Sequence, residues 1–452
     1  MPLAAQSTPG KSAQARTVAY FQSVRTQPPL LWAFLKNMPK GADLHSHLSG
    51  AIYAESMIDW AAQDGLCVDQ KTLVLSQPPC AEAMGQVPAK NAQTDPLLFR
   101  HMIDAWSMRN PLASGLSGHD LFFDSFDKFN AATAKRDGDM LAEVAARASA
   151  GRVSYLELMT TPAFSETYKV ATRVGWNDDF ASMRRSLLEN GLSNLVKAVA
   201  DNLDHATQRQ RNILHCATPQ ADAACDLTLR YLYQVLRGMP REVVFTQMLL
   251  GFELASRNAR FVGLNLVMPE DALVPMRDFA LHMRLLDYLH GLYPKVQITL
   301  HAGELVPGLV PPEGLRSHIR DSIDIGHASR IGHGVDVMQE DDAVGLLRKM
   351  ASRRILVEVC LTSNSGILGV SGAQHPLAAY LKYDVPVALA SDDEGVSRSE
   401  MTRRVCEGST GAAARLPAVE NHVPQQPAAC VCRRRAAVAG RAALAPRHGL
   451  RR

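Results

Sequence analysis

The sequence has no continuous apolar run of about 18 residues or more, so it offers no transmembrane helix of ordinary length. Residues 1–7 lack both the charged segment and the apolar segment of a signal peptide. As the sequence stands, we therefore expect a cytoplasmic protein. A periplasmic or secreted protein is the alternative if the true start lies upstream, because residues 3–6 resemble the remnant of an export signal.

Aromatic residues are few, at 6%, and the net charge of the 452 residues is only +3. Much of the positive charge lies at the end of the chain, where residues 403–452 contain ten Arg and two Glu. The remainder is mildly acidic and shows no basic patch of the kind that nucleic-acid-binding proteins carry. We expect neither a nucleic-acid partner nor a membrane partner, and the sequence leaves the oligomeric state open.

Cysteine motifs are absent as well. The chain has eight Cys but no Cys-x-x-Cys pair, and a chain of this size does not need disulfides to fold. We expect mostly unpaired thiols. No Gly-x-Gly-x-x-Gly follows the first expected strand, so a dinucleotide-binding fold is not favoured.

Apolar runs alternate with helical patterns along most of the chain. Eight βα-type units predict an α/β fold, a (β/α)8 TIM-type barrel, with an open doubly wound sheet as the alternative. The expected strands are 41–48, 153–159, Asn194–Ala200, Phe261–Val267, Gln297–His301, Arg330–His333, Ile355–Cys360 and Val385–Ala390.

Four regions follow from this pattern. Residues 1–37 form a tail and a helix, and residues 38–402 form the barrel. Within the barrel, residues 64–135 connect the first two strands and predict a helical cap inserted after strand 1. Residues 403–452 contain no Ile, Phe, Tyr, Trp or Lys, which predicts a disordered Arg/Ala-rich tail. That tail is either a basic arm for an anionic partner or an out-of-frame translation of a GC-rich gene, and we favour the second.

Residues with metal-binding and acid–base chemistry stand at four expected strand ends, where a barrel builds its active site. The first group is His45-Ser46-His47, whose imidazoles point to one side of a strand. The others are His301 with Glu304, the glycine-flanked His333, and the pair Asp392-Asp393. Each group alone has an ordinary structural explanation, but together they form a site of three or more His and a carboxylate. Such a donor set suits Zn²⁺.

This ordered set resembles the adenosine deaminase family of metal-dependent barrel hydrolases. The resemblance rests on His45-x-His47, His301-Ala-Gly-Glu304, Arg330-Ile-Gly-His333-Gly and Asp392-Asp393. It spans about residues 38–402, and Glu358-Val359-Cys360, Ser363-Asn364 and His375-Pro376-Leu377 fit it too. The long insertion is similar to that of the secreted growth-factor-type branch of the family.

The resemblance implies a role for each residue. His45, His47, His301 and Asp392 would bind one zinc ion per chain, and a zinc-bound hydroxide would attack C6 of a purine nucleoside. Glu304 would protonate purine N1, His333 would orient the attacking water, and Asp393 would contact N7. The products would be inosine and ammonia from adenosine or deoxyadenosine.

Two positions depart from the family pattern. Ser49 stands where members often have an Asp that contacts the sugar, and Met268 stands where they have a Gly near purine N3. The substrate is therefore left open, and another adenine-type compound is one alternative. The aberrant tail motivates a second alternative, a catalytically impaired nucleoside-binding protein. The family also closes its barrel with a helix after Asp393, which we expect here to be lost or poorly formed.

Overall fold

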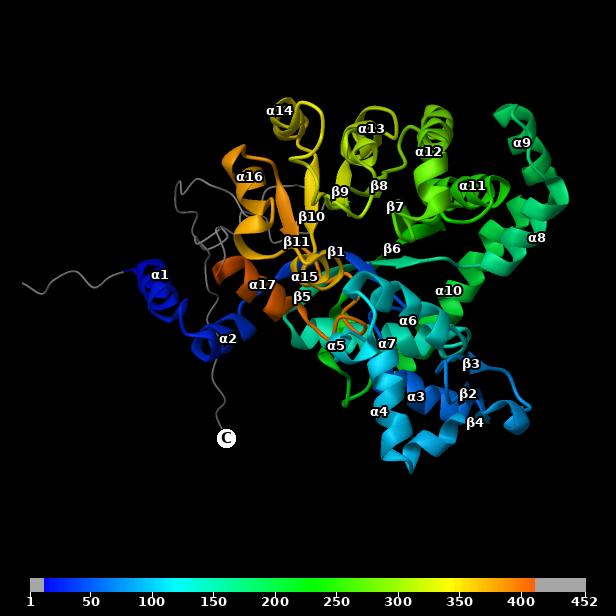
Figure 1. Ribbon diagram of the computed structural model, residues 1–452, viewed down its shortest axis with the longest axis horizontal. Helices are drawn as coiled ribbons and strands as arrows, with labels where there is room; N and C mark the ends of the chain where they lie inside the picture. Colours follow the sequence, from blue (N-terminus) through cyan, green and yellow to red (C-terminus); the bar gives the residue numbers. More distant parts are fainter. Residues whose placement is uncertain (1–11, 411–452) are drawn as a thin grey trace, which may run out of the picture.

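The structure is a computed structural model that describes residues 12–410, and the N-terminal and C-terminal segments outside this range are not considered further. Helices α1 (Ala13–Val24) and α2 (Pro28–Lys36) precede the first strand and lie at one side of the molecule (Figure 1). The sequence predicts one helix within residues 1–37, and the structure has two.

Eight parallel strands form a closed barrel, as the sequence predicts. Two four-stranded sheets have the orders β1-β5-β6-β7 and β11-β10-β9-β8. Parallel bridges between Ser46 and Asp392 and between Leu264 and Ile298 join the sheets at both edges. The strands are β1 (Gly41–His47), β5 (Val153–Thr160), β6 (Thr228–Leu236), β7 (Phe261–Val267), β8 (Thr299–Ala302), β9 (Arg330–His333), β10 (Leu356–Val359) and β11 (Val387–Leu389).

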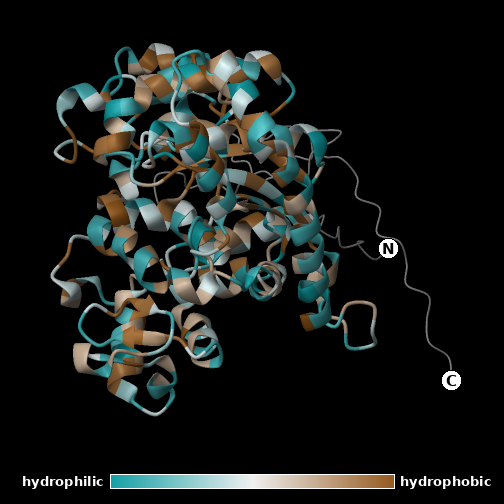
Figure 2. Cartoon of the chain, turned by 90° about the vertical axis from the view of Figure 1, so that its right-hand side faces the viewer, coloured by the Kyte–Doolittle hydropathy of each residue, from teal (hydrophilic) through white to brown (hydrophobic). Residues whose placement is uncertain are grey.

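Helices surround this barrel and bury their apolar faces against it. Helix α11 is buried continuously from Val243 to Leu254, whereas polar and apolar residues alternate along the more peripheral helices (Figure 2). The helices that follow the strands are α7 (Asp137–Ala150), α8 (Phe164–Val174), α9 (Phe180–Leu187), α10 (Ser193–Ile213), α11 (Arg241–Arg257), α12 (Leu273–Leu292), α13 (His318–Asp324), α14 (Ala343–Arg353), α15 (Leu361–Leu368) and α16 (Leu377–Lys382).

The third barrel strand is not where the sequence predicts it. Residues Asn194–Ala200 belong to helix α10, and the strand is β6 (Thr228–Leu236). The run 194–200 is short and apolar, which fits a buried strand and a helix equally well. The buried positions of α10 are Val199, Ala206 and Gln210, and their spacing is that of one helix face.

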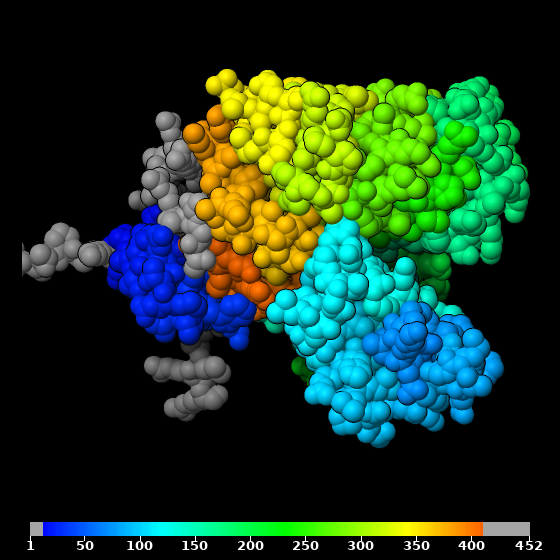
Figure 3. Space-filling view, viewed as in Figure 1, coloured from blue at the N-terminus to red at the C-terminus, as the bar shows by residue number. Residues whose placement is uncertain are grey.

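The long connection after β1 and α3 (Ala54–Gln63) forms a lobe beside the barrel, coloured blue to cyan in Figure 3. It contains the expected helical segments and also a small antiparallel sheet that the sequence analysis missed. The lobe contacts the loop after β7, where His119 Nε2 lies 3.0 Å from Asp271 Oδ1. Its elements are β2 (Cys67–Asp69), β3 (Leu75–Ser76), β4 (Gln86–Pro88), α4 (Pro96–Ala105), α5 (Pro111–Ser114) and α6 (Gly118–Thr133). Its role as a cap stays a prediction.

The expectation of mostly unpaired thiols is wrong for the described part of the chain. Disulfides join Cys67 to Cys80 and Cys216 to Cys225, while the buried Cys360 is a free thiol. The pairs form because chain reversals bring the two residues together, which the sequence spacing did not reveal. Among residues 12–410, no helix is long and apolar enough to cross a membrane.

A helix is present after Asp393, in the region where the sequence predicts that the closing helix is lost or poorly formed; the disruption of that helix stays a prediction. Helix α17 runs from Met401 to Thr410, and the rest of the predicted tail lies outside the described residues. Arg404 on this helix is fully buried and donates a hydrogen bond of 2.6 Å to the carbonyl of Ser391. Helix α17 therefore holds the loop that begins directly after β11.

Candidate active site

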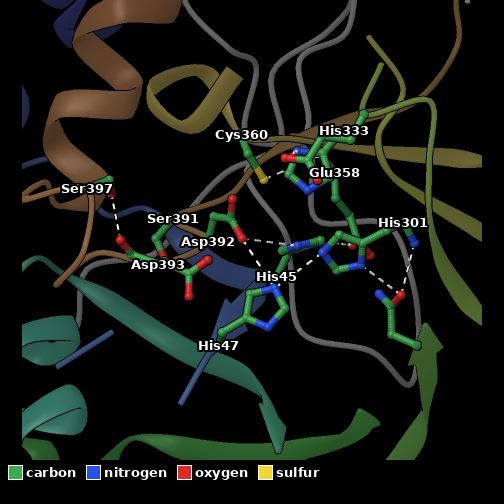
Figure 4. Close-up of polar contacts among 12 residues, drawn as sticks. His45, His47, His301, His333, Glu358, Cys360, Ser391, Asp392, Asp393 and Ser397 are labelled. Atoms are coloured by element: carbon green, nitrogen blue, oxygen red, sulfur yellow. Dashed lines mark hydrogen bonds and ion pairs between the residues drawn. The ribbon is translucent and has the colours of Figure 1, made fainter. Parts of the chain in front are cut away.

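Every residue that the sequence predicts as a metal ligand lies at the same end of the barrel. His45 and His47 end β1, His301 lies in β8, and Asp392 follows β11. His333 ends β9 beside them. Because all eight strands are parallel, their carboxyl ends meet at one rim, and the side chains from distant segments converge there (Figure 4).

The ligand atoms lie at distances that suit one metal ion. His45 Nε2 and His47 Nε2 are 3.4 Å and 3.3 Å from Asp392 Oδ1, and His47 Nε2 is 3.3 Å from His301 Nε2. Donor atoms about 2.1 Å from a tetrahedral zinc ion lie about 3.4 Å from one another. One donor atom from each of His45, His301, His333 and Asp392 also lies within 4.8 Å of the others.

Three of these imidazoles are oriented by oxygen acceptors behind them. His45 Nδ1 lies 2.7 Å from the Glu358 carboxylate, and His47 Nδ1 lies 2.8 Å from Gln234 Oε1. The oxygen of Asn265 accepts both the backbone N–H and the Nδ1–H of His301, each at 2.9 Å. Each acceptor takes the Nδ1 hydrogen, so each Nε2 keeps its lone pair for a metal.

The donor set therefore fits a cation. Two Nε2 lone pairs that face each other at 3.3 Å repel unless a positive charge lies between them. The pKa of His45 supports this, since burial lowers it but Asp392 and Glu358 raise it to about 10. The carboxylates thus favour positive charge at this position, which a metal ion supplies without protonating its ligands. The sequence analysis assigned no role to Gln234 and Asn265, although both are polar residues within buried strands.

Glu304 is a buried acid at the edge of this cluster. It is 7% exposed, and its Oε1 lies 3.5 Å from Nδ1 of His333. Burial, followed by the charges of Asp392 and Glu270, raises the pKa of Glu304 well above its usual value. This shift favours the protonated carboxyl, the form that can donate a proton.

The backbone around Glu304 is fixed by a buried ion network that the sequence analysis missed. Glu270 accepts the backbone N–H of Glu304 at 2.9 Å and lies 2.7 Å from His318 Nδ1. The Arg237 guanidinium donates to the carbonyls of Met268 and His301 at 3.1 and 3.0 Å. Burial raises the pKa of Glu270, but His318 and Arg237 outweigh this effect and lower the pKa to about 2.

The ring of His333 packs between the other imidazoles. Its centroid is 5.1 Å from that of His45 and 5.0 Å from that of His301. Burial lowers the pKa of His333 to about 3, so the ring is neutral. A neutral imidazole carries one hydrogen and one lone pair, and which nitrogen carries the hydrogen decides what the ring can do.

Asp393 lies on the other side of Asp392, and one donor atom from each of the two carboxylates and His47 lies within 4.8 Å of the others. Burial is the first cause that raises the pKa of Asp393 well above its usual value; His47 lowers it and Asp392 raises it further. Its Oδ1 has no hydrogen-bond partner among residues 12–410. Gly50 allows this approach, because a Cβ there would lie 1.6 Å from Asp393 Oδ1.

Ser49 and Met268, the two departures from the family pattern, lie at the same end of the barrel as the cluster. Ser49 is partly exposed in the turn after β1. Met268 follows β7, is 37% exposed, and has a φ of +82°, a conformation that glycine adopts more readily than methionine.

Comparisons with known proteins agree with this arrangement. The adenosine deaminase of Vibrio vulnificus (strain YJ016) is 22% identical over 375 residues, which cover 82% of this chain and 87% of that protein. Two solved structures share the fold. The Arabidopsis N6-mAMP deaminase MAPDA has a TM-score of 0.54 at 21% identity and covers 85% of this chain and 90% of that one. The adenine deaminase from Arthrobacter aurescens has a TM-score of 0.52 at 18% identity, with coverages of 84% and 90%.

The family model described as adenosine deaminase matches residues 119–408, which include β8, β9 and the Asp392-Asp393 pair. That range is more than half of the chain. The chain therefore belongs to the adenosine deaminase family of metal-dependent hydrolases.

Proposed function

We propose that this protein is a zinc-dependent deaminase that converts adenosine or deoxyadenosine to the inosine product and ammonia. The observation that carries the proposal is the buried carboxyl of Glu304, whose pKa is raised by burial, beside a cluster of imidazoles and a carboxylate. His45, His47, His301 and Asp392 would hold one zinc ion. Zinc lowers the pKa of a water molecule that it binds to about 7, which supplies a nucleophile at neutral pH.

Glu304 acts as the general acid in this proposal. Addition of an oxygen atom at C6 of the purine places negative charge on N1, which needs a proton. The raised pKa of Glu304 favours the protonated carboxyl that would supply it, and Glu270 accepts the backbone N–H of Glu304. His333, which is neutral, acts as a hydrogen-bond donor to the attacking oxygen.

Asp393 orients the base. Purine N7 is an acceptor, so it needs a donor, and the raised pKa of Asp393 favours the protonated carboxyl, which is such a donor. Ser49 and Met268 are the proposed contacts to the sugar and to N3. The left-handed backbone of Met268 keeps the shape that a glycine has there, so its N–H remains the proposed partner of N3.

The test is an assay of the full chain loaded with zinc, which follows the change in ultraviolet absorbance and the release of ammonia. Adenosine, deoxyadenosine, adenine, AMP and N6-methyl-AMP form the substrate panel, since solved structures of similar fold include an adenine deaminase and an N6-mAMP deaminase. We expect turnover of the two nucleosides and its loss with a chelator. Turnover of adenine alone would replace the proposed substrate, and one bound zinc without ammonia release would refute the activity.

The two disulfides and the long insertion also support a proposal about compartment and branch. Disulfides persist in oxidising compartments and are rare in the cytosol. We therefore propose that the chain is exported and belongs to the growth-factor-type branch. The test is mass spectrometry of protein taken from the native host and alkylated without reduction. If the proposal is right, the four disulfide cysteines remain unalkylated; if it is wrong, all four are alkylated.

A further inference from the structure

A chain of hydrogen bonds lies behind His333 and has no part in the chemistry described so far. Asn364, in helix α15, has its Nδ2 3.0 Å from His333 Nδ1. His375 Nε2 lies 3.0 Å from Asn364 Oδ1, and the backbone N–H of Leu377 lies 3.1 Å from His375 Nδ1. His333, Asn364 and His375 are 1%, 0% and 3% exposed.

The direction of every hydrogen bond in this series follows from the last one, which the backbone N–H of Leu377 donates to His375. A backbone N–H only donates, so His375 Nδ1 is an acceptor and the hydrogen of that ring is on Nε2. That hydrogen goes to Asn364 Oδ1, which turns the amide nitrogen of Asn364 toward His333. His333 Nδ1 is therefore an acceptor, and His333 carries its hydrogen on Nε2. Reversing any bond would place two buried donors or two buried acceptors face to face, at about 1–3 kcal/mol each.

We propose that Asn364 and His375 are positioning residues that set the tautomer of His333 and so separate its role from that of the three other imidazoles. The inference rests on the proposed function, in which His333 donates a hydrogen bond. Acceptors behind His45, His47 and His301 leave their Nε2 lone pairs free. The donor behind His333 does the opposite: it occupies the one lone pair of the ring and places a hydrogen on Nε2.

The surroundings of His333 Nε2 agree with this assignment. It is buried and has no hydrogen-bond partner within residues 12–410. A hydrogen on this nitrogen would therefore be available to an oxygen atom of a ligand bound beside it. Four imidazoles stand together, and the polarity of the residues behind them makes three of them metal ligands and the fourth a donor.

Asn364→Asp tests the proposal with almost no change of shape. A carboxylate accepts but does not donate, so His333 must then place a hydrogen on Nδ1. Nitrogen NMR of the zinc-loaded full chain with 15N-labelled histidine reports which nitrogen carries hydrogen, and the His333→Gln spectrum assigns the signal. We expect Nε2–H in the wild type and Nδ1–H in Asn364→Asp. We expect kcat to fall about 100-fold, as when one oriented donor is removed, with KM and zinc content little changed.

Two matched variants separate this effect from a general loss of structure. Asn258→Asp, on a distant loop where the Asn oxygen only accepts, should leave kcat and the His333 signal unchanged. His375→Gln keeps a donor near the position of Nε2 and should retain most activity, whereas His375→Leu should lose it. This pair keeps the test valid if Asn364→Asp does not fold.

Three results would overturn the inference. One is a wild-type His333 that carries its hydrogen on Nδ1. The second is an Asn364→Asp variant in which His333 Nδ1 carries no hydrogen, and the third is an Asn364→Asp variant that retains full kcat. The NMR measurement does not depend on turnover. An Nε2–H tautomer in a protein without deaminase activity would therefore refute the proposed function but not the inference that Asn364 and His375 set the tautomer of His333.

Discussion

Replacing Arg330 should destabilise the barrel by breaking a buried ion network below the active site. Arg330 begins β9, and its guanidinium lies 2.5 Å from Glu157 and 2.7 Å from Glu358. The two carboxylates are 6% and 0% exposed, so neither can regain full hydration when the guanidinium is removed. Loss of one member of a buried ion pair costs about 3–5 kcal/mol. Because Glu358 keeps its bond to His45, we expect Arg330→Met to lower the free energy of unfolding by about 3 kcal/mol, near the lower end of this range.

Urea unfolding of the metal-free full chain measures this difference. The control is Arg316→Met, whose partner Asp341 is as exposed as Arg316 itself, at 60% and 59%, so its loss should cost less than about 1 kcal/mol. Burial raises the pKa of Glu358, but Arg330 and then His45 lower it below its usual value. A carboxyl whose pKa is lower in the folded state than in the unfolded chain stabilises the fold at pH values above its unfolded pKa. That stabilisation is lost as the pH falls through the folded pKa. The difference in unfolding free energy between the wild type and Arg330→Met should therefore become smaller in acid. Equal costs for the two Arg variants at neutral pH would refute the reasoning.

Three further changes have definite expected outcomes. Glu304→Gln should keep bound zinc by elemental analysis but lose about 10²–10⁴ in kcat, because the proton donor is gone while the ligands remain. Gly50→Ala should push the Asp393 carboxyl away, since its Cβ would lie 1.6 Å from Oδ1, and steady-state kinetics should show kcat/KM lowered about 100-fold. Burial raises the pKa of Asp336 well above its usual value of 3.8, so the folded protein holds a proton there that the unfolded chain releases. The stability of the wild type therefore falls as the pH rises. In thermal unfolding, Asp336→Asn should have a higher melting temperature than the wild type above about pH 4 and no such advantage below it.

The barrel and the site residues were predictable from the sequence because both depend on local pattern. An apolar run that ends in a polar residue marks a strand and its end, and the parallel arrangement then places His45, His301 and Asp392 at one rim without further information. Strand β6 was missed because residues 194–200 mimic a buried strand over a length too short to show a helical period. The disulfides were missed because their formation depends on how two chain segments fold back on each other.

The residues behind the site could not be predicted in the same way, and they carry much of its chemistry. A histidine in a sequence is known to have two nitrogens, but the nitrogen that holds the hydrogen depends on its partner. For His45 that partner is Glu358, for His47 it is Gln234, and both lie far along the chain on other strands. The distinction between a ligand and a donor is thus a property of the closed barrel, where each imidazole meets an acceptor or, at His333, the amide of Asn364. A relative with all four histidines but an acceptor in place of Asn364 should therefore keep its metal and lose its turnover.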